Sequence, residues 1–176
     1  MSETVTLSQF LSAPVGSGVR GEARAAGSGA RIPVVGVLPV GAAEFSSVRG
    51  AIPAGYLARE LRGRKMRTVA DLFDEFAAAF QFPYYFGQNK DAFDECLRDL
   101  DDFVGPADGY VVVIRNAALL LADQPGERAW FAEAVTDAAT VWSTRDTAFR
   151  VVLQDAAPAG LPATTLALEP DSATES

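Results

Sequence analysis

The feature that most constrains the fold is a run of five apolar residues, Tyr-Val-Val-Val-Ile, at positions 110–114. A strand without polar alternation is typical of a central position in a parallel sheet that is covered on both sides. The segments around it read in the order strand, helix, helix, strand, helix, strand, with the first strand at 56–61 and the last at 149–153. This order predicts an α/β layered domain with a small, mostly parallel, three-stranded sheet packed with helices.

Three segments have the apolar spacing of amphipathic helices, at about 69–80, 91–100 and 126–140. Thr68 stands where the first helix needs a side-chain cap, and a proline follows its end. Cys96 falls on the apolar face of the second helix. We therefore expect Cys96 to be a small core residue and not a nucleophile.

The two ends of the chain differ in composition from this middle part. Residues 1–53 are rich in Gly, Ala, Ser and Pro, so we expect a partly ordered extension without a core of its own. Within it, 32–40 is strand-like, but its two prolines favour an edge position or an extended cover. Residues 156–176 are expected to form a flexible acidic tail. Residues 54–155 are then the folded domain.

The composition excludes several classes of function. The 176 residues include no His and one Cys, which removes His-based acid–base chemistry, His-ligated metal sites and internal disulfides. We therefore expect no enzyme activity, no cofactor and no metal. The net charge of −8 argues against nucleic-acid binding. No signal peptide and no apolar stretch of about 18–20 residues is seen, so we expect no membrane contact. A chain with a lone Cys fits the reducing cytoplasm, where we expect it to be found. We also expect a monomer.

The most informative segment combines aromatic residues with a dense run of acids. A loop with three aromatic side chains at 84–86 precedes the second helix, and residues 91–102 contain six acids and one base. Asp91 and Glu95 lie four residues apart and so share a helix face. Charge runs usually face only water. Rigid aromatic side chains beside convergent carboxylates are instead typical of a surface that binds Arg and Lys side chains of a partner.

This segment also resembles the barstar family, the intracellular inhibitors of barnase-type ribonucleases. The family pattern Tyr-x-Gly-x-Asn-x-Asp-Ala, followed by an acidic residue and Cys-Leu, is matched by residues 85–92 and 95–97. The resemblance extends over about 56–153 and includes Leu72 and the closing strand. It implies a barstar-like layered fold. It also implies an antitoxin or immunity protein that blocks the active site of a small basic ribonuclease.

The resemblance implies roles for single residues. Tyr85 would lie over the catalytic base of the ribonuclease, Asn89 would contact its guanine-site loop, and Asp91 would pair with a basic active-site residue. Glu95 would take a phosphate position between Arg and Lys side chains, and Glu127 would be an outlying acidic contact. With the other motif positions, the predicted partner-binding residues are Tyr85, Phe86, Gly87, Asn89, Asp91, Asp94, Glu95 and Glu127.

The sequence departs from the family pattern at three of these positions. Glu95 is one methylene longer than the family's central Asp, Asp94 replaces a large apolar residue, and Phe86 replaces a second Tyr. These changes fit a related but different ribonuclease, or a partner of another kind. The alternative hypothesis is an acidic protein-interaction module on a barstar-like scaffold, which binds a basic protein that is not a ribonuclease.

A basic stretch surrounds the first predicted strand and the turn after it. Such charges are typical of an edge strand that is protected from pairing with other chains. The alternative is self-association of this stretch with the acidic helix of a second copy. The stretch contains Arg59, Arg62, Arg64, Lys65 and Arg67.

Overall fold

The structure, a computed structural model, describes residues 5–13, 34–83 and 86–169. Its described part contains one six-stranded sheet in the order β1-β6-β2-β5-β4-β3, and every neighbouring pair of strands is parallel. The prediction of three strands is therefore wrong in number, although the mostly parallel character is confirmed. The strands are β1 (Val5–Thr6), β2 (Val35–Leu38), β3 (Tyr56–Arg62), β4 (Gly109–Arg115), β5 (Ala148–Gln154) and β6 (Thr164–Ala167).

The three predicted strands are β3, β4 and β5, and they lie side by side in the sheet. The apolar run at 110–114 lies in β4, which pairs with β3 on one side and with β5 on the other. Its five side chains are buried, as expected of a strand that is covered on both faces. The basic strand β3 forms the edge of the sheet, as predicted.

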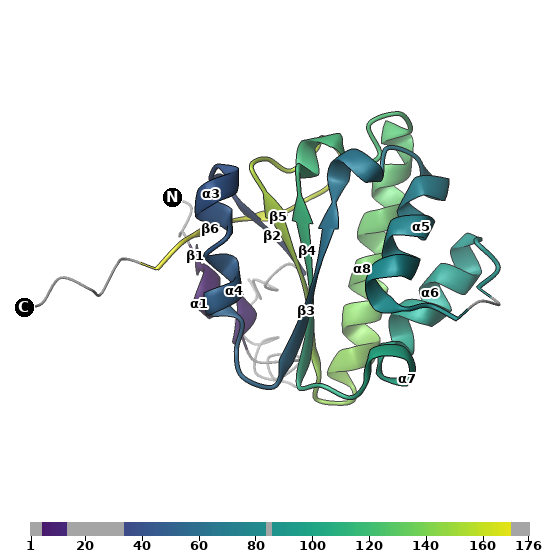
Figure 1. The fold of residues 1–176 in the computed structure, drawn as a ribbon, viewed down its shortest axis with the longest axis horizontal. Coiled ribbons are helices and arrows are strands. Elements are labelled where there is room, and N and C mark those ends of the chain that lie inside the picture. Colours follow the sequence, from purple (N-terminus) through teal and green to yellow (C-terminus); the bar gives the residue numbers. More distant parts are fainter. Residues whose placement is uncertain (1–4, 14–33, 84–85, 170–176) are drawn as a thin grey trace, which may run out of the picture.

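Four helices cover one face of the sheet (Figure 1). Thr68 caps α5 by accepting a hydrogen bond from the Asp71 backbone N–H at 3.1 Å. The core between these helices and the sheet is rich in aromatic rings, with Phe76 lying 5.1 Å from Phe93 and 6.0 Å from Phe131 between ring centroids. The helices of this layer are α5 (Val69–Phe80), α6 (Lys90–Arg98), α7 (Leu100–Val104) and α8 (Arg128–Ser143).

The opposite face of the sheet carries a second hydrophobic core, formed largely by the N-terminal part of the chain. Short helices α1 (Leu7–Leu11), α3 (Ala42–Phe45) and α4 (Val48–Ala51) cover this face (Figure 1). The prediction that residues 1–53 lack a core is thus wrong for the described part of that segment. Every second residue of the central strands faces this core and needs a cover. The buried members are Leu7, Phe10, Leu11, Leu38, Phe45, Val48, Val111, Val113, Val152 and Leu166.

Strand β2 lies in a segment that was expected at an edge of the sheet, and strand β6 lies in the segment that was expected to be a flexible tail. β2 was expected at an edge, but it lies between β5 and β6 because Pro39 follows the strand and leaves its hydrogen bonds intact. Residues 156–176 were expected to be flexible, but Thr164 and Thr165 pair with β2. The division of the chain at residues 53/54 and 155/156 remains a prediction, and the sheet extends across both positions.

A buried arginine of β5 holds the N-terminal segment in place. Arg150 donates hydrogen bonds to the backbone carbonyls of Phe10 at 3.3 Å and Ala13 at 3.2 Å, at the end of α1. A cation at the C-terminal end of a helix is electrostatically favourable. The remaining described elements are three 3-10 turns, and no described helix is both long and apolar enough to cross a membrane. The turns are η1 (Gly63–Lys65), η2 (Ala117–Leu119) and η3 (Pro125–Glu127).

Candidate partner-binding surface

Helix α6 holds its acidic side chains outward because its opposite side is firmly packed. Phe93, Cys96 and Leu97 are buried, whereas Asp91 and Glu95 are exposed. The Trp142 indole N–H donates to the Leu97 carbonyl at 2.8 Å and fixes the C-terminal part of the helix to α8. The two carboxylates, one helical turn apart, are therefore presented on a rigid support, as the sequence predicted.

Asn89 and its neighbours fix the loop that leads into α6. The Asn89 side-chain oxygen accepts from the Ala92 backbone N–H at 2.8 Å, so Asn89 is the N-cap of the helix. Gln88 has a positive φ of 49° and donates to the Asp74 carboxylate of α5 at 3.0 Å. Gly87 is exposed, and a Cβ at this position would lie 2.9 Å from the Asn89 side-chain nitrogen. Asn89 is exposed, so the same residue stabilises the helix and lies at the surface.

The Asn89→Ala variant is expected to lose about 1 kcal/mol of unfolding free energy, because the Ala92 N–H loses its cap. Urea unfolding followed by circular dichroism measures this difference. The Asn89→Asp variant is the control, since Asp also accepts the capping bond and should keep most of the stability. Equal stability of Asn89→Ala and the unmodified chain would show that this cap contributes nothing.

The aromatic loop lies only partly within the described residues. Phe86 is half-buried, and its ring packs edge-on against Phe73 at 5.7 Å and Phe82 at 5.2 Å. In the free protein the ring therefore joins the loop to the core, and the residue as a whole is only partly covered. Tyr85, the other predicted aromatic contact, lies outside the described residues.

Glu127 is already paired within the chain. Its carboxylate accepts from the Lys90 ammonium at 2.6 Å, and the same ammonium lies 5.1 Å from the centre of the Trp130 ring. This pair ties the beginning of α8 to the beginning of α6. Lys90 was not singled out in the sequence, and no local signal could have identified a partner 37 positions away. A partner that uses Glu127 has to share it with Lys90.

Asp94 differs from the two exposed acids of α6. It is half-buried, and its Oδ1 atom makes no hydrogen bond within the described residues. Burial raises the pKa of Asp94 above its ordinary value; Arg98 opposes this shift, and Asp137 and Asp91 reinforce it. Folding therefore makes ionisation of Asp94 less favourable than it is in the unfolded chain. The contribution of Asp94 to the free energy of unfolding is complete below the ordinary Asp pKa. It is lost as the pH rises through the raised pKa of the folded chain.

The Asp94→Asn variant is expected to be more stable than the unmodified chain at pH 7 by about 1 kcal/mol, because no buried carboxylate has to ionise. This advantage should vanish in acid, where Asp94 is itself neutral. Thermal unfolding at a series of pH values measures both effects. Asp91→Asn, an exposed change on the same helix, is the matched control and should give no gain. An Asp94→Asn chain that is less stable at pH 7 would contradict this account of the site.

The arrangement suits binding by charge and not covalent chemistry. Cys96 is buried, and burial raises the pKa of its thiol to about 11, so it stays protonated as expected of a core residue. Within the ranges that the structure describes, no three His, Cys, Asp or Glu side chains are grouped so that they could hold a metal ion. Asp99, Asp101 and Asp102 are also exposed, and they continue the acidic surface beyond α6.

Comparison with protein-family models matches residues 56–154 to Barstar (barnase inhibitor). This match covers 99 of the 176 residues and includes β3, β4, β5 and the helices from α5 to α8. A comparison with curated proteins gives no match. The segment that carries α6 and its exposed carboxylates thus lies within the matched residues, and the chain belongs to the Barstar (barnase inhibitor) family.

Proposed function

We propose that this chain binds a small basic ribonuclease of the barnase type, blocks its active site, and so acts as an antitoxin or immunity protein. The observation that carries this proposal is the pair of exposed carboxylates, Asp91 and Glu95, on a helix that is anchored by buried residues within the family segment. Such an inhibitor would act as a monomer in the cytoplasm, where it would protect the RNA of its own cell.

The mechanism follows from the chemistry of the target. A ribonuclease active site is a cationic cleft that binds a phosphodiester. Carboxylates on a rigid helix can occupy the positions of the phosphates and so exclude RNA, and complementary charge accelerates encounter. In this arrangement Glu95 takes a phosphate position, Asp91 pairs with a basic active-site residue, and Asn89 contacts the loop at the guanine site. Tyr85 would cover the catalytic base.

Asp94 and Glu127 would have smaller parts in this interface. Asp94 is half-buried beside Glu95, so only part of its carboxylate is open to a partner. Glu127 shares its charge with Lys90 at 2.6 Å. We therefore expect the binding energy to depend mainly on Asp91 and Glu95, because exposed rim charges contribute little.

Titration of a purified barnase-type ribonuclease with this chain tests the proposal, with RNA cleavage as the readout. We expect inhibition to be complete at equal molar amounts and to be lost in the Glu95→Lys variant. Glu44→Lys is the matched control, because Glu44 is an exposed glutamate on a helix of the other sheet face, and it should inhibit normally. A folded chain that inhibits no barnase-type ribonuclease would overturn the proposal. Binding of a basic protein without inhibition would favour the interaction module instead.

A further inference from the structure

The edge strand β3 leaves backbone hydrogen-bonding groups open to the outside of the sheet. The Arg62 backbone N–H is bound by the Glu75 carboxylate at 2.9 Å, and the Tyr56 N–H by the Pro53 carbonyl at 3.1 Å. Neither group therefore donates to β4. Alternate residues of a strand direct their backbone groups to the same side, so Ala58 and Glu60 also face outward. Neither residue has a partner for these groups within the described part of the chain.

A groove of about 350 Å³ lies beside this open edge, lined by apolar residues together with Arg49, Arg59 and Glu60. Its walls come from α3, α4 and the segment after them, through Phe45, Val48 and Ile52, and its floor includes Val113 of β4. Ala58 of β3 also lines the groove, where a larger side chain would fill it. A strand that is added to the β3 edge would direct every second side chain towards this groove.

The charges around the edge are mostly basic and only partly compensated. The Glu60 carboxylate accepts a hydrogen bond from the Arg115 guanidinium at 2.6 Å. The Arg49 guanidinium lies 3.7 Å from the same carboxylate, and the Arg49 side chain is 82% exposed. Strand alternation places Arg59 on the α5 face, with Leu57 and Leu61. The Nε atom of Arg59 is buried and has no hydrogen-bond partner within the described residues. Arg59 also forms no ion pair within the described residues, so an acidic side chain of an added strand on that face would give its guanidinium a partner.

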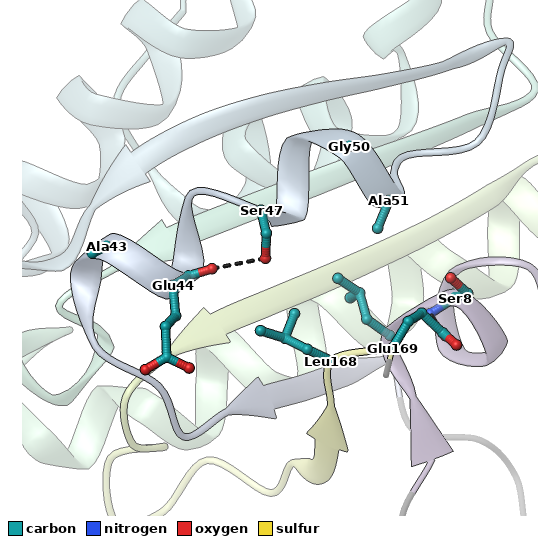
Figure 2. Close-up of a pocket in the computed structure, with 9 residues that line it drawn as sticks. Ser8, Ala43, Glu44, Ser47, Gly50, Ala51, Leu168 and Glu169 are labelled. Carbon is teal, nitrogen blue, oxygen red and sulfur yellow. Dashed lines mark hydrogen bonds between the residues drawn. The ribbon is translucent and has the colours of Figure 1, made fainter. Parts of the chain in front are cut away.

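A larger hollow on the same sheet face lacks these features (Figure 2). It measures about 530 Å³ and lies among α1, the α3–α4 pair and the segment after β6. Two of its polar side chains are already bonded within the chain: the Ser47 hydroxyl donates to the Glu44 carbonyl at 2.7 Å, and Glu169 accepts from the Ser8 backbone N–H at 3.3 Å. None of the residues that line it belongs to a described strand.

A second copy of the chain fits the β3 edge poorly. In a two-fold dimer, β3 would pair antiparallel with β3 of the other copy, and Ala58 of each copy would exchange hydrogen bonds with Glu60 of the other. Arg59 would then lie directly opposite the same arginine of the other copy. Like charges in direct opposition destabilise a strand pair. The edge therefore favours a partner segment of opposite charge.

We propose that the β3 edge binds an extended acidic segment of a partner protein as an added strand, with apolar side chains in the groove and carboxylates beside Arg59 on the opposite face. Arg49, at the rim of the groove, adds a positive charge that attracts the segment. Main-chain hydrogen bonds to Ala58 and Glu60 supply affinity, and the groove and the arginines supply specificity. This site uses none of the α6 residues, so it is independent of ribonuclease binding.

Fluorescence anisotropy with a labelled, end-capped peptide Glu-Val-Glu-Val-Glu tests this site on the full chain. We expect saturable binding, with a Kd at least about tenfold higher for the Lys-Val-Lys-Val-Lys peptide. A Glu-Val-Glu-Val-Glu peptide with methylated backbone nitrogens should not bind, because it cannot donate to the edge. No binding of the acidic peptide, or equal binding of the methylated form, would overturn the proposal.

Variants of the chain locate the binding. Ala58→Trp should raise the Kd by about tenfold or more by filling the groove, whereas Ala118→Trp, at an exposed position on η2, should leave it unchanged. Arg49→Glu changes a largely exposed side chain, so the variant should still fold. It should raise the Kd for the acidic peptide and lower the Kd for the basic peptide. Unchanged affinities in Ala58→Trp and Arg49→Glu would place the peptide elsewhere. A chain dimer that Ala58→Trp dissociates would assign the edge to self-association and contradict the proposal.

Discussion

A chain that lacks residues 1–53 is expected not to fold cooperatively, although the deleted part lies outside the segment that matches the family. The deletion removes β1, β2, α1, α3 and α4. β5 would lose its four pairs with β2, and β6 would lose both of its neighbours. Val111, Val113 and Val152, which are buried in the second core, would then face water.

The expected loss is comparable with the whole stability of a domain. Six buried residues of the second core lie in the deleted part, and each contributes about 1.5–3 kcal/mol. Domains of ordinary size are stable by about 5–15 kcal/mol. Differential scanning calorimetry should therefore show no unfolding transition for the truncated chain. A two-state transition with an unchanged far-ultraviolet spectrum would mean that the N-terminal segment is not part of the fold.

A single substitution tests the same core with less disruption. Phe45→Ala is expected to cost about 3–5 kcal/mol, because Phe45 is 1% exposed and its removal leaves a cavity. Leu119→Ala is the control, since Leu119 is 37% exposed and should change the unfolding free energy by less than about 0.5 kcal/mol. Similar effects of the two variants in urea unfolding would contradict the second core.

The largest effect on partner binding is expected from the double variant Asp91→Ala/Glu95→Ala. Each substitution would leave a basic side chain of the ribonuclease buried and unpaired, at a cost of about 3–5 kcal/mol, roughly a 150- to 5,000-fold rise in Kd. Both residues are exposed in the free chain, so its own folding should be little changed. Isothermal titration calorimetry measures the affinity, and circular dichroism checks the fold.

Salt provides a second readout for the same pair. Because complementary charge speeds encounter, association of the unmodified chain should slow as the ionic strength rises. The double variant should show a much weaker dependence on salt. An unchanged affinity, or an unchanged salt dependence, would place the interface away from α6.

The local signals in the sequence were sufficient for one layer of the fold. The apolar run at 110–114 and the helical spacing with Thr68 as a cap predicted β4 and α5, because both depend on near neighbours in the chain. The presentation of Asp91 and Glu95 followed from helix periodicity alone. By contrast, the pair of Glu127 with Lys90 and the partial burial of Asp94 depend on how α8 packs against α6, which local spacing does not encode.

The second layer depends on contacts between distant residues. β6 pairs with β2, although the whole segment that matches the family lies between these two strands in the sequence. The composition near Thr164 therefore gave no sign of a strand. Gly36 lies within β2, and a Cβ there would lie 2.5 Å from the Leu166 side chain. The glycine is required because β6 approaches closely at this point. Only the three-dimensional arrangement distinguishes this role from that of a flexible linker.

The central claim is that the α6 surface and an RNA substrate compete for one site on a ribonuclease. The most direct measurement is the Kd of this chain for a purified barnase-type ribonuclease at increasing concentrations of guanosine 3′-monophosphate, which fills the active site. The account predicts that the apparent Kd rises in proportion to the nucleotide concentration. A Kd that is unchanged at saturating nucleotide would show that the chain binds elsewhere and would contradict the account.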